Sequence, residues 1–203
     1  DVHEASSIAE NLKDNEAKIN LHGKRADGIV KSMLQHSRSS TGQKELTDVN
    51  KLVEEYVRLA YHGYRARKKD FNVTLDIHTD PQVGPVMMVS QDIGRVLLNL
   101  LNNAFQAVEE KSWAEGNGYQ PRVTVQTTRT QQGADIRVED NGPGIPKAIR
   151  EKIFQPFFTT KPTGHGTGLG LSLSYDIAKA QGGQLLLDTE KDGITAFLLH
   201  IKA

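Results

Sequence analysis

Four glycines alternate with other residues in a short stretch near the C-terminal end of the chain. They are Gly164, Gly166, Gly168 and Gly170, and a predicted helix follows them. Such a turn can present backbone N–H groups to an anion, because glycine has no Cβ and allows close approach. The stretch therefore predicts an anion-binding loop, with a flexible surface loop as the alternative.

Two asparagines are spaced four residues apart in the segment NLLNNAFQA. Asn99 and Asn103 lie on one face of a helix, and Asn102 points roughly 100° away. Amide oxygens can ligate Mg²⁺, which usually keeps water and substrate phosphates as its other ligands. The pair predicts a magnesium site. The alternative is that both amides cap neighbouring backbone.

A carboxylate follows a predicted strand in the segment EDNGPGIP, residues 139–146. Asp140 opens a turn in which Gly142 and Gly144 can adopt backbone angles that other residues resist. A buried carboxylate at a strand end can accept a hydrogen bond from the exocyclic amine of adenine. An ordinary Asp-Asn-Gly turn has the same local pattern, so the segment alone does not decide between the two.

Two common phosphate-binding motifs do not fit the chain. No segment has the Gly-Lys-Ser/Thr ending of a P-loop. Asp188 ends a predicted strand about twenty residues after the glycines, as in a dinucleotide-binding fold. However, the glycines recur every second residue, and QPFFTTKP before them is not a strand. Both motifs are excluded.

The composition limits the partners and the compartment. Lys plus Arg and Asp plus Glu both number 25, so no overall field attracts nucleic acid or an anionic membrane. The chain has no cysteine, which fits a reducing compartment. We find no signal peptide and no apolar run of membrane-spanning length. We expect a cytoplasmic fragment, whose parent chain can still be membrane-associated.

A long helix is predicted at the N-terminal end. Apolar or small residues recur at steps of three and four from residue 8 to residue 33, and the helix should be roughly 35 residues long. Its apolar stripe needs a partner helix, from a second copy or from another segment, and packing along its own domain is the alternative. Residues 37–43, SRSSTGQ, predict a break, so we expect one unit at residues 1–42 and a second at 43–203.

The second unit combines helices and antiparallel strands. Helices are expected from residues 47–50 to 65–69, from Ser90 as N-cap, and along LSLSYDIAKAQ. Strands are expected at 71–78, at VMMV, and as two hairpins that close at residues 130–133 and around KDG. The pattern predicts an α+β fold, a two-layer α/β sandwich.

The order of four motifs resembles a known family. NLLNNA, DNGPG, FQPFFTTK and GTGLGLS follow one another as do the N, G1, F and G2 boxes of the ATP-binding domain of sensor histidine kinases, in the GHKL superfamily. The resemblance covers about residues 47–203 and implies the Bergerat ATP-binding fold. Residues 20–38 resemble the second helix of the dimerisation hairpin in these kinases.

The resemblance implies ATP and Mg²⁺ as cofactors and a role for each motif. Asn103 would hold the metal, Asp140 would bind the adenine amine, and Lys161 could reach the γ-phosphate, although a solvated loop lysine is the alternative. Residues 154–161 and the glycines would form a mobile lid anchored by packing of Phe157 and Phe158. The nucleotide-binding residues implied are Asn99, Asn103, Asp140, Gly142, Gly144, Ile145, Phe158, Thr159, Thr160, Lys161, Gly164, Gly166, Thr167, Gly168, Leu169, Gly170 and Leu171.

Three positions bear on the reaction. ATP-hydrolysing relatives such as gyrase carry a water-activating glutamate four residues before the metal asparagine. Asn99 stands there and cannot act as a base, which favours phosphoryl transfer. Gln106 stands where many members have a lysine that could help bind phosphate. Of the seven histidines, only His3 precedes a glutamate, and no proline follows in HEASSIAEN.

We therefore expect a histidine kinase core whose acceptor helix lies outside this sequence, so that the fragment does not autophosphorylate. His22 and His36 are interpreted as contacts in the seam of the long helix. The expected partners are ATP, a response-regulator receiver domain and a second copy bound through the N-terminal helix. A GHKL ATPase and a nucleotide-regulated interaction module are the alternatives.

Overall fold

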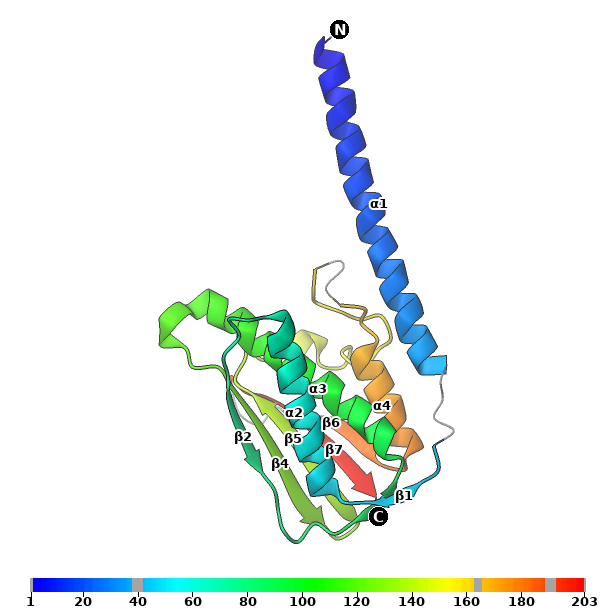
Figure 1. The fold of residues 1–203 in the computed structure, drawn as a ribbon, viewed down its shortest axis with the longest axis vertical. Coiled ribbons are helices and arrows are strands. Elements are labelled where there is room, and N and C mark those ends of the chain that lie inside the picture. Colours follow the sequence, from blue (N-terminus) through cyan, green and yellow to red (C-terminus); the bar gives the residue numbers. More distant parts are fainter. Residues whose placement is uncertain (1, 38–41, 163–165, 189–192, 203) are drawn as a thin grey trace.

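The computed structural model describes residues 2–37, 42–162, 166–188 and 193–202. A long N-terminal helix precedes a domain of helices and strands (Figure 1). The elements in chain order are α1 (Val2–Ser37), β1 (Glu45–Thr47), α2 (Val49–Arg67), β2 (Thr74–His78), β3 (Val86–Met88), α3 (Ser90–Glu115), η1 (Gly116–Gly118), β4 (Arg122–Thr130), β5 (Gly133–Asp140), η2 (Lys147–Ile149), α4 (Gly170–Ala180), β6 (Gln184–Asp188) and β7 (Thr195–Lys202).

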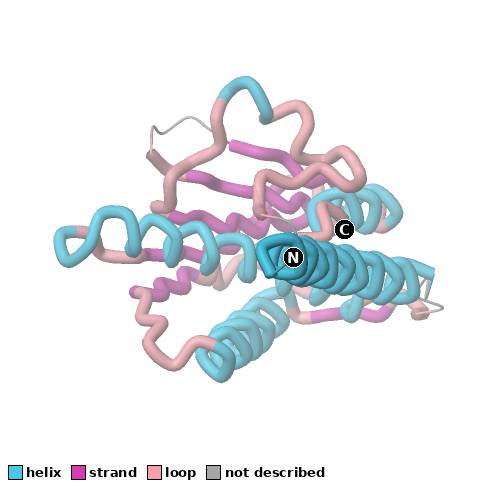
Figure 2. The backbone as a smooth tube through the Cα atoms, turned by 90° about the horizontal axis from the view of Figure 1, so that it is seen from above, coloured by secondary structure: helices cyan, strands magenta, loops and turns pink. Residues whose placement is uncertain are grey.

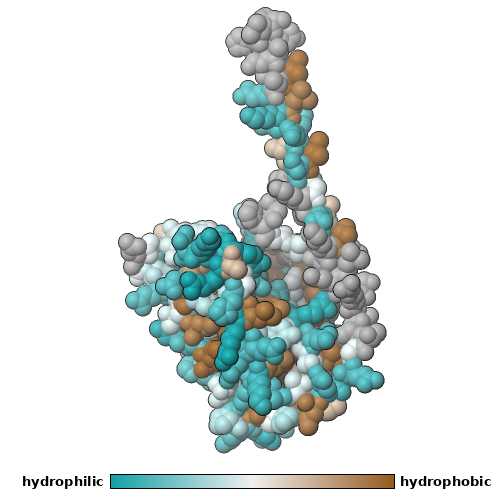
Figure 3. Space-filling model, in the orientation of Figure 1, coloured by the Kyte–Doolittle hydropathy of each residue, from teal (hydrophilic) through white to brown (hydrophobic). Residues whose placement is uncertain are grey.

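Helix α1 has 36 residues, close to the predicted length, and extends away from the domain (Figure 1). Its apolar seam is exposed at the positions whose side chains the structure describes. Ile8, Leu12 and Ile19 have 55%, 64% and 72% of their surface accessible, and apolar side chains are visible along the helix in Figure 3. Within the described residues, no helix combines the length and the hydropathy needed to cross a membrane. At these three positions the seam therefore lacks apolar cover in the isolated chain.

Five strands form the main sheet in the order β2-β4-β5-β7-β6. Strands β2 and β4 are parallel, and the other neighbours are antiparallel. The first hairpin pairs Thr130 with Gly133, as the sequence predicts. The burial of β5 alternates strictly along its eight residues. One face of the sheet therefore covers the core and the other faces solvent.

Helices α2, α3 and α4 lie on one side of this sheet (Figures 1 and 2). Helix α3 forms the centre of the layer, because its three- and four-residue spacing buries one wide face. Its fully buried side chains are Ile93, Val96, Leu97, Leu101, Phe105 and Val108. The predicted two-layer α/β sandwich is confirmed.

The structure differs from the sequence-based expectation at three element boundaries. Glu45–Thr47 forms β1, which pairs with β3, whereas the prediction starts a helix signal at Thr47. Strand β2 begins at Thr74 and not at residue 71, because the segment before it packs into the core and buries Phe71 and Val73. Ser90 does not cap α3: its hydroxyl donates to the Glu45 carboxylate, and Val89 is the N-cap. Helix α2 is capped as expected, since Asp48 accepts from the Lys51 N–H at 3.1 Å.

Candidate functional site

One stripe of helix α3 contacts each of the other conspicuous sequence motifs in turn. Its residues Asn99, Asn103, Ala107 and Lys111 recur every four positions and share a face. Asn99 contacts the start of α4, Asn103 faces Lys161, and the last two residues contact the loop after β5. Motifs that lie up to 70 residues apart in sequence are thus gathered along a single helix.

Asp140 ends strand β5 and is buried, with 5% of its surface accessible. Its Oδ1 accepts a hydrogen bond from the Gly142 N–H at 2.9 Å. A Cβ on Gly142 would lie 2.7 Å from that oxygen and 2.8 Å from the Cβ of Ala107. Only glycine allows the loop to pass between the carboxyl group and α3. The carboxyl group therefore keeps a fixed orientation.

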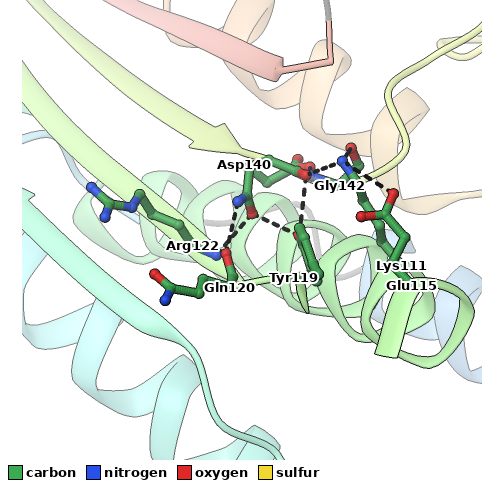
Figure 4. Close-up of polar contacts among 8 residues, drawn as sticks. Lys111, Glu115, Tyr119, Gln120, Arg122, Asp140 and Gly142 are labelled. Atoms are coloured by element: carbon green, nitrogen blue, oxygen red, sulfur yellow. Dashed lines mark hydrogen bonds and ion pairs between the residues drawn. The ribbon is translucent and has the colours of Figure 1, made fainter. Parts of the chain in front are cut away.

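The next residue, Asn141, secures the loop to its surroundings. Figure 4 shows Lys111, Tyr119, Gln120 and Arg122 around this loop. Its Oδ1 accepts from the Tyr119 hydroxyl at 2.7 Å and from the Arg122 N–H at 2.8 Å, and its Nδ2 donates to the Gln120 carbonyl at 2.8 Å. Lys111 donates to the carbonyl oxygen of Asn141 at 3.0 Å. The loop is held by side chains and backbone on both sides, so it is a rigid support for Asp140.

Burial raises the pKa of Asp140 to about 7, because the charged form loses its water. The Gly142 N–H and the Lys111 ammonium act in the opposite direction, and the Glu139 carboxylate adds to the rise. Near neutral pH the carboxyl group is balanced between its two protonation states. A buried acid with such a shift is typical of functional sites.

Asn103 faces the segment that precedes the glycines. Its Oδ1 accepts from the Lys161 ammonium at 3.4 Å, and the same ammonium donates to Gln106 Oε1. The Lys161 N–H donates to Thr159 Oγ1 at 3.1 Å, and a Cβ on Gly166 would lie 3.1 Å from Lys161 Cδ. The lysine side chain is therefore folded inward, onto α3, and is not a solvated loop lysine.

Asn99 has a protein partner. Its Nδ2 donates to Ser174 Oγ at 2.9 Å, and a Cβ on Gly170 would lie 2.2 Å from its Oδ1. The amide group thus locks the first turn of α4 against α3. Asn102 points elsewhere, as predicted: it accepts from Arg67 at 3.3 Å and donates to the Leu98 carbonyl at 2.7 Å.

The two adjacent phenylalanines differ from each other. Phe158 packs against the core, whereas Phe157 is 53% exposed, so the expectation that both anchor the lid by packing is wrong for Phe157. Phe157 has a φ of 66°, in the left-handed region. A Cβ on Gly168 would lie 2.4 Å from its carbonyl carbon. The backbone at Phe157 serves as a tight turn against which the glycine stretch rests.

The other predicted site residues lie around these contacts. Gly144 has a φ of 80° and open space beside it. Ile145 and Leu171 pack against the core, and Thr160 is exposed. Thr167 Oγ1 accepts from the Leu169 N–H at 3.4 Å, next to the first turn of α4. Gly164 lies outside the described residues, as does part of the predicted glycine loop.

These groups fit a nucleotide with a divalent cation. Asn103 Oδ1 and Gln106 Oε1 already accept from an ammonium group, so this point of the site favours positive charge. In the part of the chain that the structure describes, no three His, Cys, Asp or Glu side chains could hold a metal ion. A cation here would therefore take an amide oxygen from the protein and its remaining ligands from phosphates and water.

Several contributors were not recognised from the sequence. Lys111 and Tyr119 support the Asp140 loop, and Ser174 binds Asn99. Gln106 was noted in the sequence, but its contact with Lys161 was not predicted. Lys111 carries a signal in retrospect, because it continues the four-residue spacing of the α3 stripe. The other partners are contacts between distant segments and leave no local pattern.

The comparisons with known proteins agree with this arrangement. Residues 88–203, more than half of the chain, match the family described as histidine kinase-, DNA gyrase B- and HSP90-like ATPases. The sensor kinase CckA of Brucella abortus is 32% identical over an alignment of 199 residues that covers 90% of this chain and 20% of that protein. The signal transduction histidine-protein kinase AtoS of Escherichia coli is 34% identical over 158 residues, 77% of this chain and 24% of that protein. The chain thus spans no more than a quarter of the length of these two relatives.

Solved structures show the same fold. The catalytic domain of the histidine kinase ThkA, in a nucleotide-free form, has a TM-score of 0.59 at 28% identity, covering 74% of this chain and 93% of that one. Full-length ShkA in complex with AMPPNP has a TM-score of 0.67 at 20% identity, covering 90% of this chain and 37% of that one, which supports the fold alone. The chain therefore belongs to the family of histidine kinase-, DNA gyrase B- and HSP90-like ATPases, and it is related to the catalytic ATP-binding domains of sensor histidine kinases.

Proposed function

We propose that the chain is the Mg²⁺·ATP-binding catalytic core of a sensor histidine kinase. It transfers the γ-phosphoryl group to a histidine on another segment, for relay to a response-regulator aspartate. The observation that carries the proposal is the α3 stripe, along which a buried carboxyl group, an amide oxygen, an inward-folded lysine and the first turn of α4 follow one another. These groups suit the adenine amine, a metal ion and the phosphates of ATP.

Each group has one task in this proposal. The Asp140 carboxylate would accept from the adenine amine, and Asn103 Oδ1 would hold a magnesium ion. The Lys161 ammonium neutralises charge on the γ-phosphate, and the backbone N–H groups from Gly166 to Leu171 contact the phosphates. The bound metal supplies charge neutralisation for the transferring group. The chain contributes mainly positioning and electrostatic stabilisation.

Transfer is favoured over hydrolysis because no base is available at Asn99. Its amide group is not ionisable and donates to Ser174. A water molecule near the terminal phosphate would find no carboxylate at this position to accept its proton. We also propose that the chain binds nucleotide but does not label itself from ATP, because only His3 of its seven histidines precedes a glutamate, and no proline follows in HEASSIAEN.

The N-terminal helix has a separate task in this proposal. We assign residues 1–42 to the second helix of a dimerisation hairpin and residues 43–203 to the ATP-binding domain. The exposed seam of Ile8, Leu12 and Ile19 supports a homodimer contact along α1. The response-regulator receiver domain would be the second protein partner. A kinase core of this kind requires ATP, so we propose a cytoplasmic location.

Nucleotide binding is tested by calorimetry with a matched pair of asparagine variants. Asn103→Ala should lose the Mg²⁺-dependent part of the ATP affinity. Asn102→Ala is the control, because its side chain contacts Arg67 and Leu98 on the other face of α3. The metal assignment would be refuted if Asn103→Ala, Asn102→Ala and the unmodified chain all bound ATP with the same affinity, both in the presence of Mg²⁺ and in its absence.

Phosphoryl transfer is tested with ATP labelled at the γ-phosphate. The chain alone should acquire no covalent label. Addition of a phosphoacceptor hairpin from a sensor histidine kinase should give an acid-labile label on that hairpin, and Asn103→Ala should abolish it. Rapid release of inorganic phosphate without labelling of the hairpin would instead identify an ATPase.

A further inference from the structure

Gln106 lies in the site and has no task in the proposed reaction so far. It is on the same face of α3 as Asn103, three residues further along the helix, and it is half-buried. Its Oε1 accepts a hydrogen bond from the Lys161 ammonium, which arrives from a segment 55 residues away in sequence. An internal helix position and the lid segment are thus joined by one polar contact.

The approach of Lys161 is determined at both ends of its side chain. Its N–H donates to Thr159 Oγ1 at 3.1 Å, which turns the backbone inward. Gly166 packs on the aliphatic part, with its notional Cβ 3.1 Å from Cδ. At the far end the ammonium reaches two amide oxygens, of Gln106 and, at 3.4 Å, of Asn103. The side chain is therefore stretched between the lid and α3.

The two amide acceptors become unequal when a metal ion binds. An ammonium group has three N–H donors. A divalent cation on Asn103 Oδ1 removes that acceptor and repels the ammonium at short range. Gln106 then remains as the protein acceptor for Lys161, one turn along the helix from the metal. The two free donors can point to oxygens of a terminal phosphate.

An amide group suits this task better than a carboxylate. A neutral acceptor orients the ammonium group without neutralising its charge, whereas a glutamate at position 106 would form an ion pair with it. The full positive charge of the lysine stays available to an anionic ligand.

We infer that Gln106 is the positioning residue for Lys161, and that the Gln106–Lys161 pair sets the preference of the site for a nucleoside triphosphate over a diphosphate. This inference rests on the proposed function, since it requires that the site binds adenine nucleotides. The Gln106–Lys161 pair affects only the binding of the terminal phosphate, because adenine and the metal ion are assigned to Asp140 and Asn103.

The experiment compares Mg²⁺·ATP and Mg²⁺·ADP affinities by calorimetry. Gln106→Ala should reduce the ATP-over-ADP affinity ratio about tenfold, as expected for loss of one charge-assisted contact, and should change the ADP affinity less than about twofold. Lys161→Met should reduce the ratio by at least as much. The double variant should match Lys161→Met alone, because the glutamine acts through the lysine.

Two further variants sharpen the result. Gln106→Glu should also lower the ratio, although it keeps a hydrogen-bond acceptor, because the ion pair reduces the charge offered to the terminal phosphate. Asn102→Ala is the control for a change of amide side chain on α3, since it contacts Arg67 and Leu98. It should leave both affinities unchanged.

The possible outcomes separate the inference from the proposed function. If the unmodified chain binds neither nucleotide, the proposed function fails. If it binds both but Gln106→Ala leaves the ratio unchanged, or lowers ATP and ADP affinity equally, the inference fails and the proposed function stands. A ratio that rises in Gln106→Ala would also overturn it, because the contact would then hold Lys161 away from the phosphate.

Discussion

Replacement of Asp140 by asparagine should stabilise the folded domain at alkaline pH. The carboxyl group is 5% accessible, and burial raises its pKa from 3.8 to about 7. Between these two values the unfolded chain releases a proton that the folded chain retains. The free energy of unfolding of the unmodified protein therefore falls as the pH rises from about 4 to about 7. Asparagine has a similar shape and carries no charge at any pH.

The magnitude follows from the size of the pKa change. A shift of about 3 units, at about 1.4 kcal/mol per unit, is a burial cost of about 4 kcal/mol above pH 7. The neutral amide oxygen of the asparagine accepts a weaker hydrogen bond from the Gly142 N–H than the carboxylate does. This loss reduces the expected gain in stability by about 1 kcal/mol. We expect Asp140→Asn to be about 3 kcal/mol more stable at pH 8, with the difference shrinking toward zero near pH 4.

Urea unfolding followed by near-ultraviolet circular dichroism measures this difference. Helix α1 contains no Phe, Tyr or Trp, so the signal reports the domain and not the helix. Asp76→Asn is the control, because Asp76 forms a partly exposed ion pair with Arg122 on the outer face of the sheet. Its effect should stay within about 1 kcal/mol. An Asp140→Asn variant with the pH slope of the unmodified protein would refute the burial argument.

Three further changes have outcomes that follow from the packing. Gly142→Ala places a Cβ 2.7 Å from Asp140 Oδ1 and should cost about 1–3 kcal/mol in urea unfolding, together with most of the affinity for adenosine; an unchanged adenosine affinity would contradict the role of this turn. Phe105→Ala leaves a cavity at a position with 0% accessibility and should lower the free energy of unfolding by about 3–5 kcal/mol, again measured by urea unfolding. A loss below about 1 kcal/mol would contradict the assigned core. The affinity for adenosine should rise by up to about tenfold for each pH unit below 7 and level off above pH 7, because the ionised form of Asp140 is the acceptor. Adenosine is the suitable ligand because it has no phosphate that titrates in this range. A flat pH profile in calorimetry would contradict the assignment of Asp140.

The fold was accessible from the sequence where the pattern is long and periodic. The spacing of Leu97, Leu100, Leu101 and Ala104 predicts α3, and alternation predicts the hairpin of β4 and β5. Strand β1 could not be recognised, because three residues carry no alternation and the strand with which it pairs, β3, lies about 40 residues away in sequence. The Ser90 cap was mispredicted, since its hydroxyl finds the Glu45 carboxylate 45 residues away instead of the helix backbone.

The site shows the same division between local and distant signals. Asp140 and Gly142 are two residues apart, and their turn chemistry is legible in the sequence. The partner of Lys161 is not, because Gln106 lies on a different element, 55 residues away, and the sequence marks it only as a departure from a family lysine. The exposure of Phe157 was also hidden, since a backbone with positive φ reverses the expected direction of the side chain.

The contact of Gly168 with the carbonyl of Phe157 joins the two ends of the segment between them. When the two ends of a loop are in contact, the entropy cost of closing the loop depends only weakly on its length. This cost grows by about 0.6 kcal/mol for each doubling of the number of residues. Changes of length or composition within such a loop need not disturb α4, which starts two residues beyond the contact. The length and sequence of the segment between Phe157 and Gly168 can therefore change in evolution while α4 keeps its position.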